Sequence, residues 1–274
     1  MNKEFKFTDA DFKFVATKVY EKSGIKLAEH KRDMVYGRLA RRLRELKFSN
    51  FKDYCNFIES SDGEKEIGNF VNAVTTNLTS FFRESHHFDH LKEELYQRSL
   101  QPKANKRIRI WSAASSSGPE PYSIAMSVCE GLKNYKAWDV KILATDIDTN
   151  MLDTAKNGVY EDHLLSKIPV GYRNKYVVKA SRKDSKGMMS ENIKSLITFK
   201  QLNLMHQWPM KGPMDFVFCR NVVIYFDKPT QIELFKKISS LMLPGAILYI
   251  GHSENLFKVS DDFELVGRTI YRKI

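Results

Sequence analysis

The amino-acid sequence predicts an α/β protein in which an all-helical N-terminal domain precedes a doubly wound, mostly parallel sheet. Residues 8 to about 95 repeat apolar side chains at helical spacing, and from Arg107 onward apolar strand-like runs alternate with helical segments. The 274-residue chain is 42% apolar and 12% aromatic, which suffices for a substantial core. Its length favours a main domain with a smaller companion. In such a sheet, ligands bind at the carboxyl ends of the strands.

Five helices are expected in the N-terminal part. Thr8 is a suitable N-cap and Gly24 a suitable stop for the first helix, which carries Phe12, Val15 and Val19 on one face. The second helix combines an apolar stripe with a basic opposite side. The apolar stripe consists of Val35, Leu39, Leu43 and Leu46, and the basic side consists of Lys31, Arg38, Arg41 and Arg42. The three later helices are expected over Phe51 to Ile58, over Glu66 to Val74 and from a point after Phe82.

The alternating part of the chain contains five strands that we expect to be parallel, followed by a closing antiparallel pair around Gly267. The expected strands are Ile108–Ser112, Val140–Asp146, Ile197–Leu202, Phe216–Cys219 and Ile247–Gly251, then Phe263–Val266 and Thr269–Arg272. The expected helices between them are Pro121–Leu132, Thr149–Lys156 and Pro229–Leu241.

One stretch, residues 157 to 196, interrupts the alternation. It includes KYVVKASRKDSKGMMSEN, two short strand-like runs around a charged turn, and predicts a small antiparallel insertion. We therefore expect a helical domain at residues 1–90 and an α/β domain at 91–274, with the inserted β-subdomain at about 160–196.

The first strand leads into a turn of small residues that opens a helix, in RIRIWSAASSSGPEPYSIAM (107 to 126). Backbone N–H groups and the positive end of the helix dipole face a ligand at such a turn. A diphosphate needs several glycines for close approach, but Gly118 is alone here. The turn therefore suits a ligand without phosphate, such as S-adenosylmethionine, whose positive charge Glu120 tolerates. The alternative is an ordinary turn with Glu120 as a helix-start charge.

Polar side chains also follow later strands. Asp146 ends the second strand, where an acid accepts hydrogen bonds from ribose hydroxyls, although it could instead cap the next helix and Asp148 competes for both roles. Arg220 and Asn221 leave the fourth strand, and Tyr225 lies just beyond.

The segment NLTSFFRESHHF (77 to 88) mixes the polar Asn77, Thr79 and Arg83 with two phenylalanines. Pure helix packing does not need that mixture, and the alternative is a linker between domains that the phenylalanines anchor. The adjacent His86 and His87 point in different directions on a helix, so they make a poor metal pair and no metal site is expected.

Composition narrows the partners and the location. The odd, well-separated cysteines Cys55, Cys129 and Cys219 suggest neither disulfides nor a zinc site. A net charge of +11 favours an anionic partner. No apolar run approaches the roughly 18 residues of a membrane helix, and the charged start, MNKEFKFTDADF, lacks a signal core, so a cytoplasmic protein is expected.

Six motifs occur in order along the chain: NLTSFFRE, WSAASSSGPEPYS, ATDID, QLNL, FCRNVVIYFD and GHSENL. Together they resemble the chemotaxis-receptor glutamate methyltransferases, the CheR family. The resemblance implies a helical domain and a seven-stranded, Rossmann-like methyltransferase domain with an inserted β-subdomain. It implies methyl transfer from S-adenosylmethionine to receptor glutamates, which leaves S-adenosylhomocysteine. The residues that it makes cofactor contacts are Asn77, Thr79, Arg83, Glu120, Asp146, Asn203, Leu204, Arg220 and Asn221.

Two features depart from the family pattern. Members commonly show a cysteine and two acids around the first turn, where this chain has Ser115 and GPEP and retains Glu120. In some relatives the β-subdomain grips a receptor's C-terminal peptide through a glycine-rich turn. Here that turn reads ASRKDSKG, so direct docking to the methylated helices could be the only contact.

The expected chemistry needs no general base, because a glutamate carboxylate with a pKa of about 4.3 is already ionised at neutral pH. We expect Arg83 and Tyr225 to orient the carboxylate or the methionine end of the cofactor. The basic side of the second helix, Arg38, Arg41 and Arg42, is expected to dock the acidic receptor helices, unless it is merely a solvated face. A monomer that binds no nucleic acid and inserts in no membrane is expected.

Two rival functions stay open. The first is a methyltransferase that acts on nucleic acid, which fits the positive net charge. Against it, this chain has RNVVIY after the fourth strand, where methyltransferases of base amines usually carry a Pro-Pro-aromatic turn. The sequence also shows no basic groove interleaved with aromatic residues. The other rival is a scaffold that binds S-adenosylmethionine without turnover.

Overall fold

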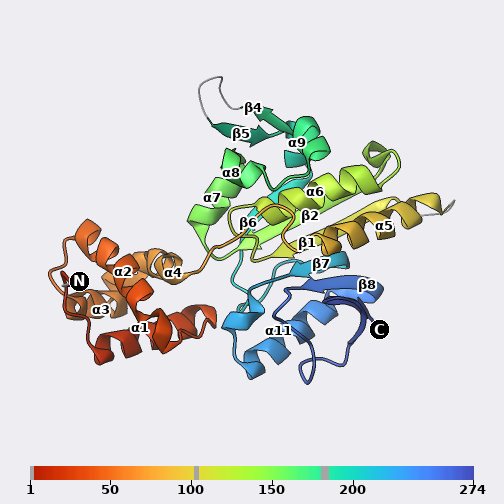
Figure 1. Ribbon diagram of the computed structural model, residues 1–274. Coiled ribbons are helices and arrows are strands. Elements are labelled where there is room, and N and C mark those ends of the chain that lie inside the picture. Colours follow the sequence, from red (N-terminus) through yellow and green to blue (C-terminus); the bar gives the residue numbers. More distant parts are fainter. Residues whose placement is uncertain (1–2, 102–104, 180–184) are drawn as a thin grey trace. The chain divides into compact units, whose positions relative to one another are not determined.

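The computed structural model describes residues 3–101, 105–179 and 185–274 and divides into two compact units (Figure 1). The first unit comprises Met1–Thr76 and Tyr225–Thr230, and the second comprises Asn77–Ile224 and Gln231–Ile274. The division therefore falls between Thr76 and Asn77. A boundary after residue 90 would cut the helix α5 (His86–Leu100), which belongs to the second unit.

The first unit is helical, as expected. Its α-helices are α1 (Asp9–Ser23), α2 (Arg32–Leu46), α3 (Phe51–Glu59) and α4 (Ile67–Val74), with 3₁₀ turns η1 (Glu29–Lys31) and η2 (Ser61–Glu66). Thr8 caps α1 through a reciprocal pair of hydrogen bonds with Asp11, and Gly24 ends the helix at a φ of 71°. The predicted apolar stripes of α1 and α2 face the core, where Val15, Val19, Val35, Leu39 and Leu43 are fully buried. The exception is Leu46, which is 37% exposed because it is the last residue of α2.

The second unit is built on a seven-stranded sheet with the order β6-β2-β1-β7-β8-β10-β9. Its parallel strands are β1 (Arg107–Ala113), β2 (Asp139–Asp146), β6 (Ile197–Gln201), β7 (Met214–Cys219) and β8 (Met242–Ile250). The strands β9 (Phe263–Gly267) and β10 (Ile270–Lys273) close the sheet as an antiparallel pair. Since β2 and β7 flank β1 on opposite sides, the strand order reverses at β1, where an α/β sheet opens a crevice.

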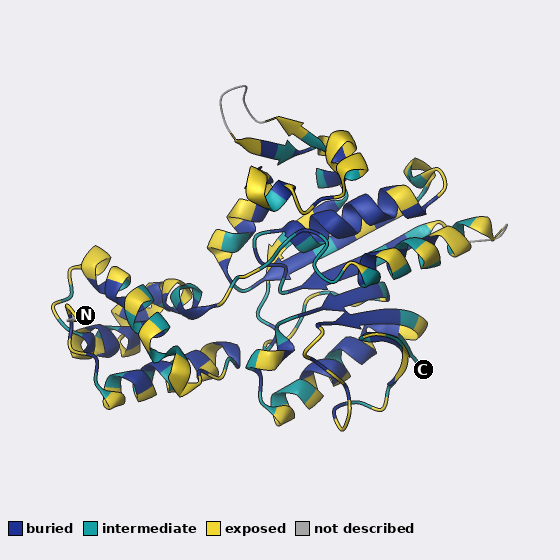
Figure 2. Cartoon of the chain, in the orientation of Figure 1, coloured by how far each residue is buried: buried dark blue, intermediate teal, exposed yellow. Residues whose placement is uncertain are grey.

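Helices cover both faces of this sheet (Figure 1). The helices α5 and α6 (Pro119–Gly131) pack side by side over one face, against Ile110, Phe218 and Tyr249. Figure 2 shows α6 almost entirely buried, because most of its side chains are apolar and its buried Ser123 and Ser127 donate to carbonyls of the same helix. The helix α11 (Lys228–Ser240) covers the opposite face, and α7 (Thr149–Asn157) packs beside β2 and β6.

The predicted insertion forms a separate three-stranded antiparallel sheet. Its strands are β3 (Val159–Glu161), β5 (Lys186–Met189) and β4 (Val177–Lys179), with β5 in the middle, and its short helices are α8 (Asp162–Leu165), α9 (Val170–Tyr176) and α10 (Glu191–Lys194). The 3₁₀ turn η3 (Tyr135–Ala137) also belongs to this unit, and the 3₁₀ turn η4 (Val223–Tyr225) spans the division after Ile224. Most of the charged turn ASRKDSKG, residues 180–184, lies outside the described residues.

The predicted fold class is confirmed: an all-helical domain, a doubly wound, mostly parallel seven-stranded sheet and an inserted antiparallel sheet. The other strands match their expected bounds to within two residues, and β8 differs most in extent. The strand β8 begins at Met242 rather than at Ile247, because Pro244 and Gly245, which usually interrupt a strand, are accommodated beside an irregular register with β7. In the described ranges, no helix is both long and apolar enough to cross a membrane.

Candidate functional site

Left-handed backbone conformations cluster at the carboxyl ends of the parallel strands. Ala114 and Ser116 after β1 and Asn221 after β7 have φ values of 58°, 50° and 58°, and Phe82 and Glu84 in the segment before α5 have 50° and 59°. Residues with a side chain avoid this region, and a folded protein usually tolerates the cost at a functional site. The hydrogen bonds described below join these same loops, which we call the crevice because an open α/β sheet receives its ligands at this point.

Asp146 organises the turn after β1. Its carboxylate accepts a 2.7 Å hydrogen bond from the backbone N–H of Ser116 and a 2.8 Å bond from that of Asp148. Burial raises the pKa of Asp146 to about 6, although the two N–H donors oppose the shift. A carboxylate has about four acceptor positions, so it retains capacity for hydroxyl groups of a ligand.

The hydrogen bonds decide which of Asp146 and Asp148 caps the helix α7. The side chain of Asp148 accepts from the N–H groups of Asn150 and Met151 and is the N-cap of α7. Asp146 therefore does not cap this helix and stays available as the acceptor for ribose hydroxyls that the sequence predicted.

Gly118 is needed in the turn for two reasons. Its φ is 102°, and a Cβ atom there would lie 2.6 Å from the hydroxyl of Tyr160 and 2.9 Å from the Cβ of Ala155. The other residues of the turn keep their side chains, so the turn is bulkier than a diphosphate loop. Ser115 Oγ is buried in this turn without a hydrogen-bond partner in the described structure. Such an orphaned hydroxyl fits a polar ligand that the turn receives.

A buried arginine links three segments beneath the crevice. Arg220, whose side chain is 1% exposed, forms ion pairs with Glu120 at 2.9 Å and with Glu84 at 3.4 Å. Glu120 also accepts a 2.8 Å hydrogen bond from Ser112 Oγ, so both its oxygens are occupied. Burial raises the pKa of Glu120, and the Arg220 charge opposes this. Arg220 and Glu120 therefore tie the start of α6 to the end of β7 and to the segment that carries Glu84.

Glu84 is a member of this network that the sequence prediction missed. One oxygen of its carboxylate bonds to His252 at 3.0 Å and to Asn221 Nδ2 at 3.3 Å. Burial opposes ionisation, but the Arg220 charge and the hydrogen bonds from His252 and Asn221 outweigh it and lower the pKa of Glu84 to about 2. The carboxylate is therefore ionised at neutral pH. Its position directly after Arg83 in the motif NLTSFFRE was the signal available in the sequence.

The segment that begins at Asn77 lies on the loops after β1 and β2. Asn77 Nδ2 donates to Asp148 at 2.8 Å, and the carbonyl of Asn77 accepts from Ser116 Oγ at 3.1 Å. Arg83 Nη1 donates to the carbonyl of Leu78 at 3.0 Å, and its half-exposed guanidinium remains near Glu84. Thr79 is half-buried between them. The segment is thus part of the crevice and more than a linker.

Asn203 and Leu204, from the motif QLNL, lie in the loop that follows β6. Asn203 Oδ1 accepts from the N–H of Met205 at 2.9 Å, which shapes the loop. Lys237 of α11 donates to the carbonyls of Leu204 at 2.8 Å and His206 at 2.7 Å. Its ammonium also lies 4.4 Å from the ring centroid of Trp208. Sequence reasoning missed Lys237, because it is 33 residues away from Leu204 and no local spacing connects the two.

Replacing Lys237 with Met should weaken binding of S-adenosylhomocysteine about five- to tenfold. Methionine retains the apolar stem over Trp208 but cannot donate to the carbonyls that hold the loop of Asn203 and Leu204. Isothermal titration calorimetry measures the change. The exposed neighbour Lys236 provides the control, and Lys236→Met should bind normally. Equal affinity of both variants would contradict the role of Lys237.

Tyr225, the second residue expected to be catalytic, clusters with the first unit. Its carbonyl accepts from the N–H of Lys26 at 2.8 Å, and the ammonium of Lys31 lies 4.4 Å from its ring centroid. The hydroxyl has no part in these two contacts, and its role in the reaction stays a prediction.

The expected docking face of α2 needs a correction. Arg42 forms a bidentate ion pair with the buried carboxylate of Glu66, with hydrogen bonds of 2.8 and 2.7 Å. Arg38 donates to the backbone carbonyls of Ala73 and Thr75 at the end of α4. Both side chains therefore hold α4 and η2 in place and are not free docking groups. Arg41 is exposed on the same helix and is the member of the three that is open to a partner.

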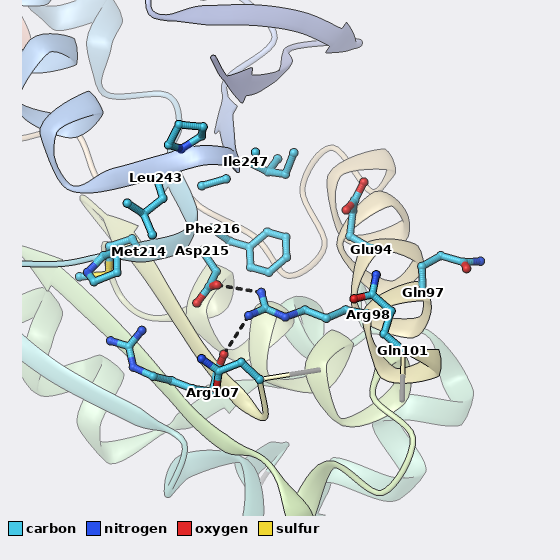
Figure 3. Close-up of a pocket in the computed structure, with 15 residues that line it drawn as sticks. Glu94, Gln97, Arg98, Gln101, Arg107, Met214, Asp215, Phe216, Leu243 and Ile247 are labelled. Atoms are coloured by element: carbon cyan, nitrogen blue, oxygen red, sulfur yellow. Dashed lines mark hydrogen bonds and ion pairs between the residues drawn. The ribbon is translucent and has the colours of Figure 1, made fainter. Parts of the chain in front are cut away.

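A separate hollow of about 710 Å³ lies at the other edge of the sheet (Figure 3). Its walls come from the amino ends of β1, β7 and β8 and from the end of α5. Arg98 bridges Asp215 and the carbonyl of Arg107, so the charges of Arg98 and Asp215 are paired with each other, and Glu94 and Arg107 also line the hollow. In a parallel sheet this edge is opposite the one that carries the crevice.

Comparison with known proteins gives a consistent result along the whole chain. Residues 10–75 match the family described as "CheR methyltransferase, all-alpha domain", and residues 77–272 match "CheR methyltransferase, SAM binding domain". The chain is 43% identical to chemotaxis protein methyltransferase 2 of Pseudomonas aeruginosa, over 98% of this chain and 95% of that protein. It is 42% identical to a probable chemotaxis protein methyltransferase of Rhizobium etli, over 93% and 96%, and 39% identical to the chemotaxis protein methyltransferase of Escherichia coli, over 99% and 93%.

Proposed function

Because this chain belongs to the CheR family of S-adenosylmethionine-dependent methyltransferases of chemotaxis, we propose that it methylates glutamate side chains of chemotaxis receptors. The products are glutamate methyl esters and S-adenosylhomocysteine. The proposal includes a monomer that acts in the cytoplasm on the acidic methylation helices of transmembrane receptors.

The observation that carries the proposal is the crevice over the carboxyl ends of the strands. Asp146 offers a buried acceptor to a ribose, and the turn after β1 combines a helix N-terminus with an orphaned Ser115 hydroxyl. These groups fit a nucleoside-type methyl donor, and the bulk of the turn disfavours a diphosphate. The proposed donor contacts are the residues of the crevice, namely Asn77, Thr79, Arg83, Glu120, Asp146, Asn203, Leu204, Arg220 and Asn221.

The substrate proposal follows from the chemistry of the reacting groups. The cofactor supplies an electrophilic methyl group on a positively charged sulfur. A glutamate carboxylate is ionised at neutral pH and needs no base to attack it, and a Ser/His/Asp or Cys/His arrangement is accordingly not required. Transfer annihilates a negative and a positive charge, so a water-poor crevice favours it. The half-exposed guanidinium of Arg83 is suited to orient a carboxylate, and such alignment is worth up to roughly 7–11 kcal/mol.

The deciding experiment is incubation of the protein with methyl-labelled cofactor and membranes from the host. The expected result is label in receptor-sized protein that mild alkali releases as methanol, which identifies a carboxyl ester. Alkali-stable label in RNA would replace the proposal by a nucleic-acid methyltransferase. Binding of S-adenosylhomocysteine without any label transfer would replace it by a scaffold.

Replacing Tyr225 with Phe should lower the turnover number at least tenfold and change the affinity for S-adenosylhomocysteine less than threefold. A hydroxyl that bonds to a charged group in the reaction contributes about 1.5–3 kcal/mol, while the ring that packs against Lys31 is retained. Steady-state methylation and calorimetry separate the two quantities. Unchanged turnover would remove Tyr225 from the mechanism.

The corrected docking face predicts that Arg41→Glu lowers the rate of receptor methylation at least fivefold at low salt. Opposed charges steer an acidic partner toward a basic surface, and salt screens that attraction. The initial rate at several salt concentrations measures the effect, which should shrink as salt rises.

The matched control is Lys52→Glu on α3, which makes the same charge reversal at another exposed position of the helical unit. It should methylate receptors at the normal rate. Because Arg42 and Arg38 hold α4, a triple reversal that includes them would test folding as well as docking. If Arg41→Glu and Lys52→Glu lose the same activity, general charge explains the effect and docking through α2 is wrong.

A further inference from the structure

Glu254, in the motif GHSENL, has a buried carboxylate whose two oxygens accept hydrogen bonds from backbone N–H groups of the loop after β7. One oxygen accepts from the N–H of Asn221 at 3.0 Å and from the N–H of Gly251. The other accepts from the N–H groups of Val223 at 2.8 Å and Ile224 at 3.3 Å. The side chain is 7% exposed, and no ion pair of the described residues includes it. The carboxylate thus satisfies four backbone donors that secondary structure leaves unpaired.

The surrounding turn is built to bring this carboxylate close. The N–H of Glu254 donates to the carbonyl of Gly251 at 2.9 Å, which folds residues 251–254 into a tight turn after β8. A Cβ atom on Gly251 would lie 2.4 Å from Asn221 Nδ2 and 2.8 Å from both the backbone nitrogen of Asn221 and Glu254 Oε2. Glycine is therefore required at this position for space.

The loop that Glu254 binds carries two of the proposed cofactor contacts. Asn221 has a left-handed φ of 58°, which a loop without support would leave readily. On its other side, Asn221 Nδ2 bonds to Glu84, which also pairs with Arg220. Two carboxylates thus hold the loop, Glu84 through the side chains of Asn221 and Arg220 and Glu254 through the backbone.

We propose that Glu254 is a positioning residue of the cofactor site, which holds residues 221–224 in the binding conformation before the cofactor arrives. Glu254 acts through the backbone of Asn221, Val223 and Ile224. The inference rests on the cofactor site of the proposed function but not on its receptor substrate. A binding measurement with S-adenosylhomocysteine therefore tests it even if the receptor assay fails.

The first variant is Glu254→Gln, which keeps the size of the side chain and replaces one acceptor oxygen by an NH₂ group that faces N–H donors. It should bind S-adenosylhomocysteine at least tenfold more weakly in calorimetry. Glu254→Asp retains both oxygens on a side chain that is one methylene shorter. Its affinity for S-adenosylhomocysteine should lie between those of Glu254→Gln and the unchanged protein. The control is Glu66→Gln, an equally buried carboxylate in the helical unit, which loses stability but should bind the ligand normally.

A double-mutant cycle distinguishes positioning from general damage. Gly251→Ala pushes a methyl group between Asn221 and Glu254, so it should weaken binding by a similar factor. If both changes disrupt the same loop, the double variant should bind about as weakly as the worse single variant. Additive losses, or normal binding by a folded Glu254→Gln, would overturn the proposal.

Hydrogen exchange of the unchanged protein gives a test that no folding defect can obscure. Without ligand, the amides of Asn221, Val223 and Ile224 should already exchange slowly, because Glu254 accepts from all three. Fast exchange that slows only when S-adenosylhomocysteine is added would show that the ligand orders the loop, and Glu254 would then have no positioning role.

Discussion

Replacing Arg220 with Met should lower the free energy of unfolding of the second unit by about 3–5 kcal/mol. The change leaves Glu120 and Glu84 close to each other and buried without their shared cation, and breaking one partner out of a buried pair costs this much. Urea denaturation followed by tryptophan fluorescence measures the loss, because all three tryptophans, Trp111, Trp138 and Trp208, belong to the second unit.

The pH dependence of this variant has a definite sign. Burial already raises the pKa of Glu120 and the Arg220 charge opposes it, so removing Arg220 raises the pKa further. Glu120 then takes up a proton as the pH falls, which removes the unpaired charge. The deficit in stability should therefore be larger at pH 8 than at pH 5.

The control for Arg220 is Arg98→Met, which breaks the 2.7 Å pair with Asp215 in the hollow of Figure 3. Arg98 is 30% exposed, and partly solvated pairs of this kind contribute about 1 kcal/mol or less. A loss in Arg220→Met no larger than in Arg98→Met would show that Arg220 is not the central cation of the site.

Replacing Asp146 with Asn should weaken binding of S-adenosylhomocysteine at neutral pH by about a hundredfold or more. The proposed ligand contacts are hydrogen bonds from two ribose hydroxyls to an ionised carboxylate, each worth about 1.5–3 kcal/mol. The amide also presents an NH₂ group to one of the N–H donors, from Ser116 or Asp148, that the carboxylate satisfies. Calorimetry at pH 7 measures the affinity.

The unchanged protein should bind this ligand about tenfold more tightly at pH 7 than at pH 5. Burial raises the pKa of Asp146 to about 6 from an ordinary value of 3.8, so the carboxylate gains its full acceptor strength only above pH 6. The effect on folding has the opposite sign. The folded protein holds this proton more tightly than the unfolded chain, so the stability that the group contributes at low pH is lost as the pH rises through about 6.

Asp146→Asn should lack this pH dependence, because an amide does not titrate. The matched control is Asp153→Asn, on the exposed side of α7, which should bind S-adenosylhomocysteine with the affinity of the unchanged protein at both pH values. An Asp146→Asn protein that binds within threefold of normal at pH 7 would exclude Asp146 as the ribose acceptor.

Most helices and strands could be predicted from local patterns along the chain. Thr8 and Gly24 limit α1 through contacts within the same helix, and the apolar stripes of α1 and α2 are the buried faces. The strand ends were also correctly predicted, since β2 ends at Asp146 and β7 ends just before Arg220. Local spacing suffices for these features, because helix periodicity, caps and strand ends depend on neighbours within a few residues.

The pairing of polar groups depends on the tertiary fold. The sequence left open whether Asp146 or Asp148 caps α7, and the positions of the backbone N–H donors show that Asp148 does. Periodicity placed Arg38 and Arg42 on the basic side of α2, but the end of α4 and Glu66 occupy them. Lys237 and Glu254 bind carbonyls and amides about 30 residues away. Such partners meet because parallel strands bring their carboxyl ends to one edge of the sheet, and no local spacing encodes which loops meet there.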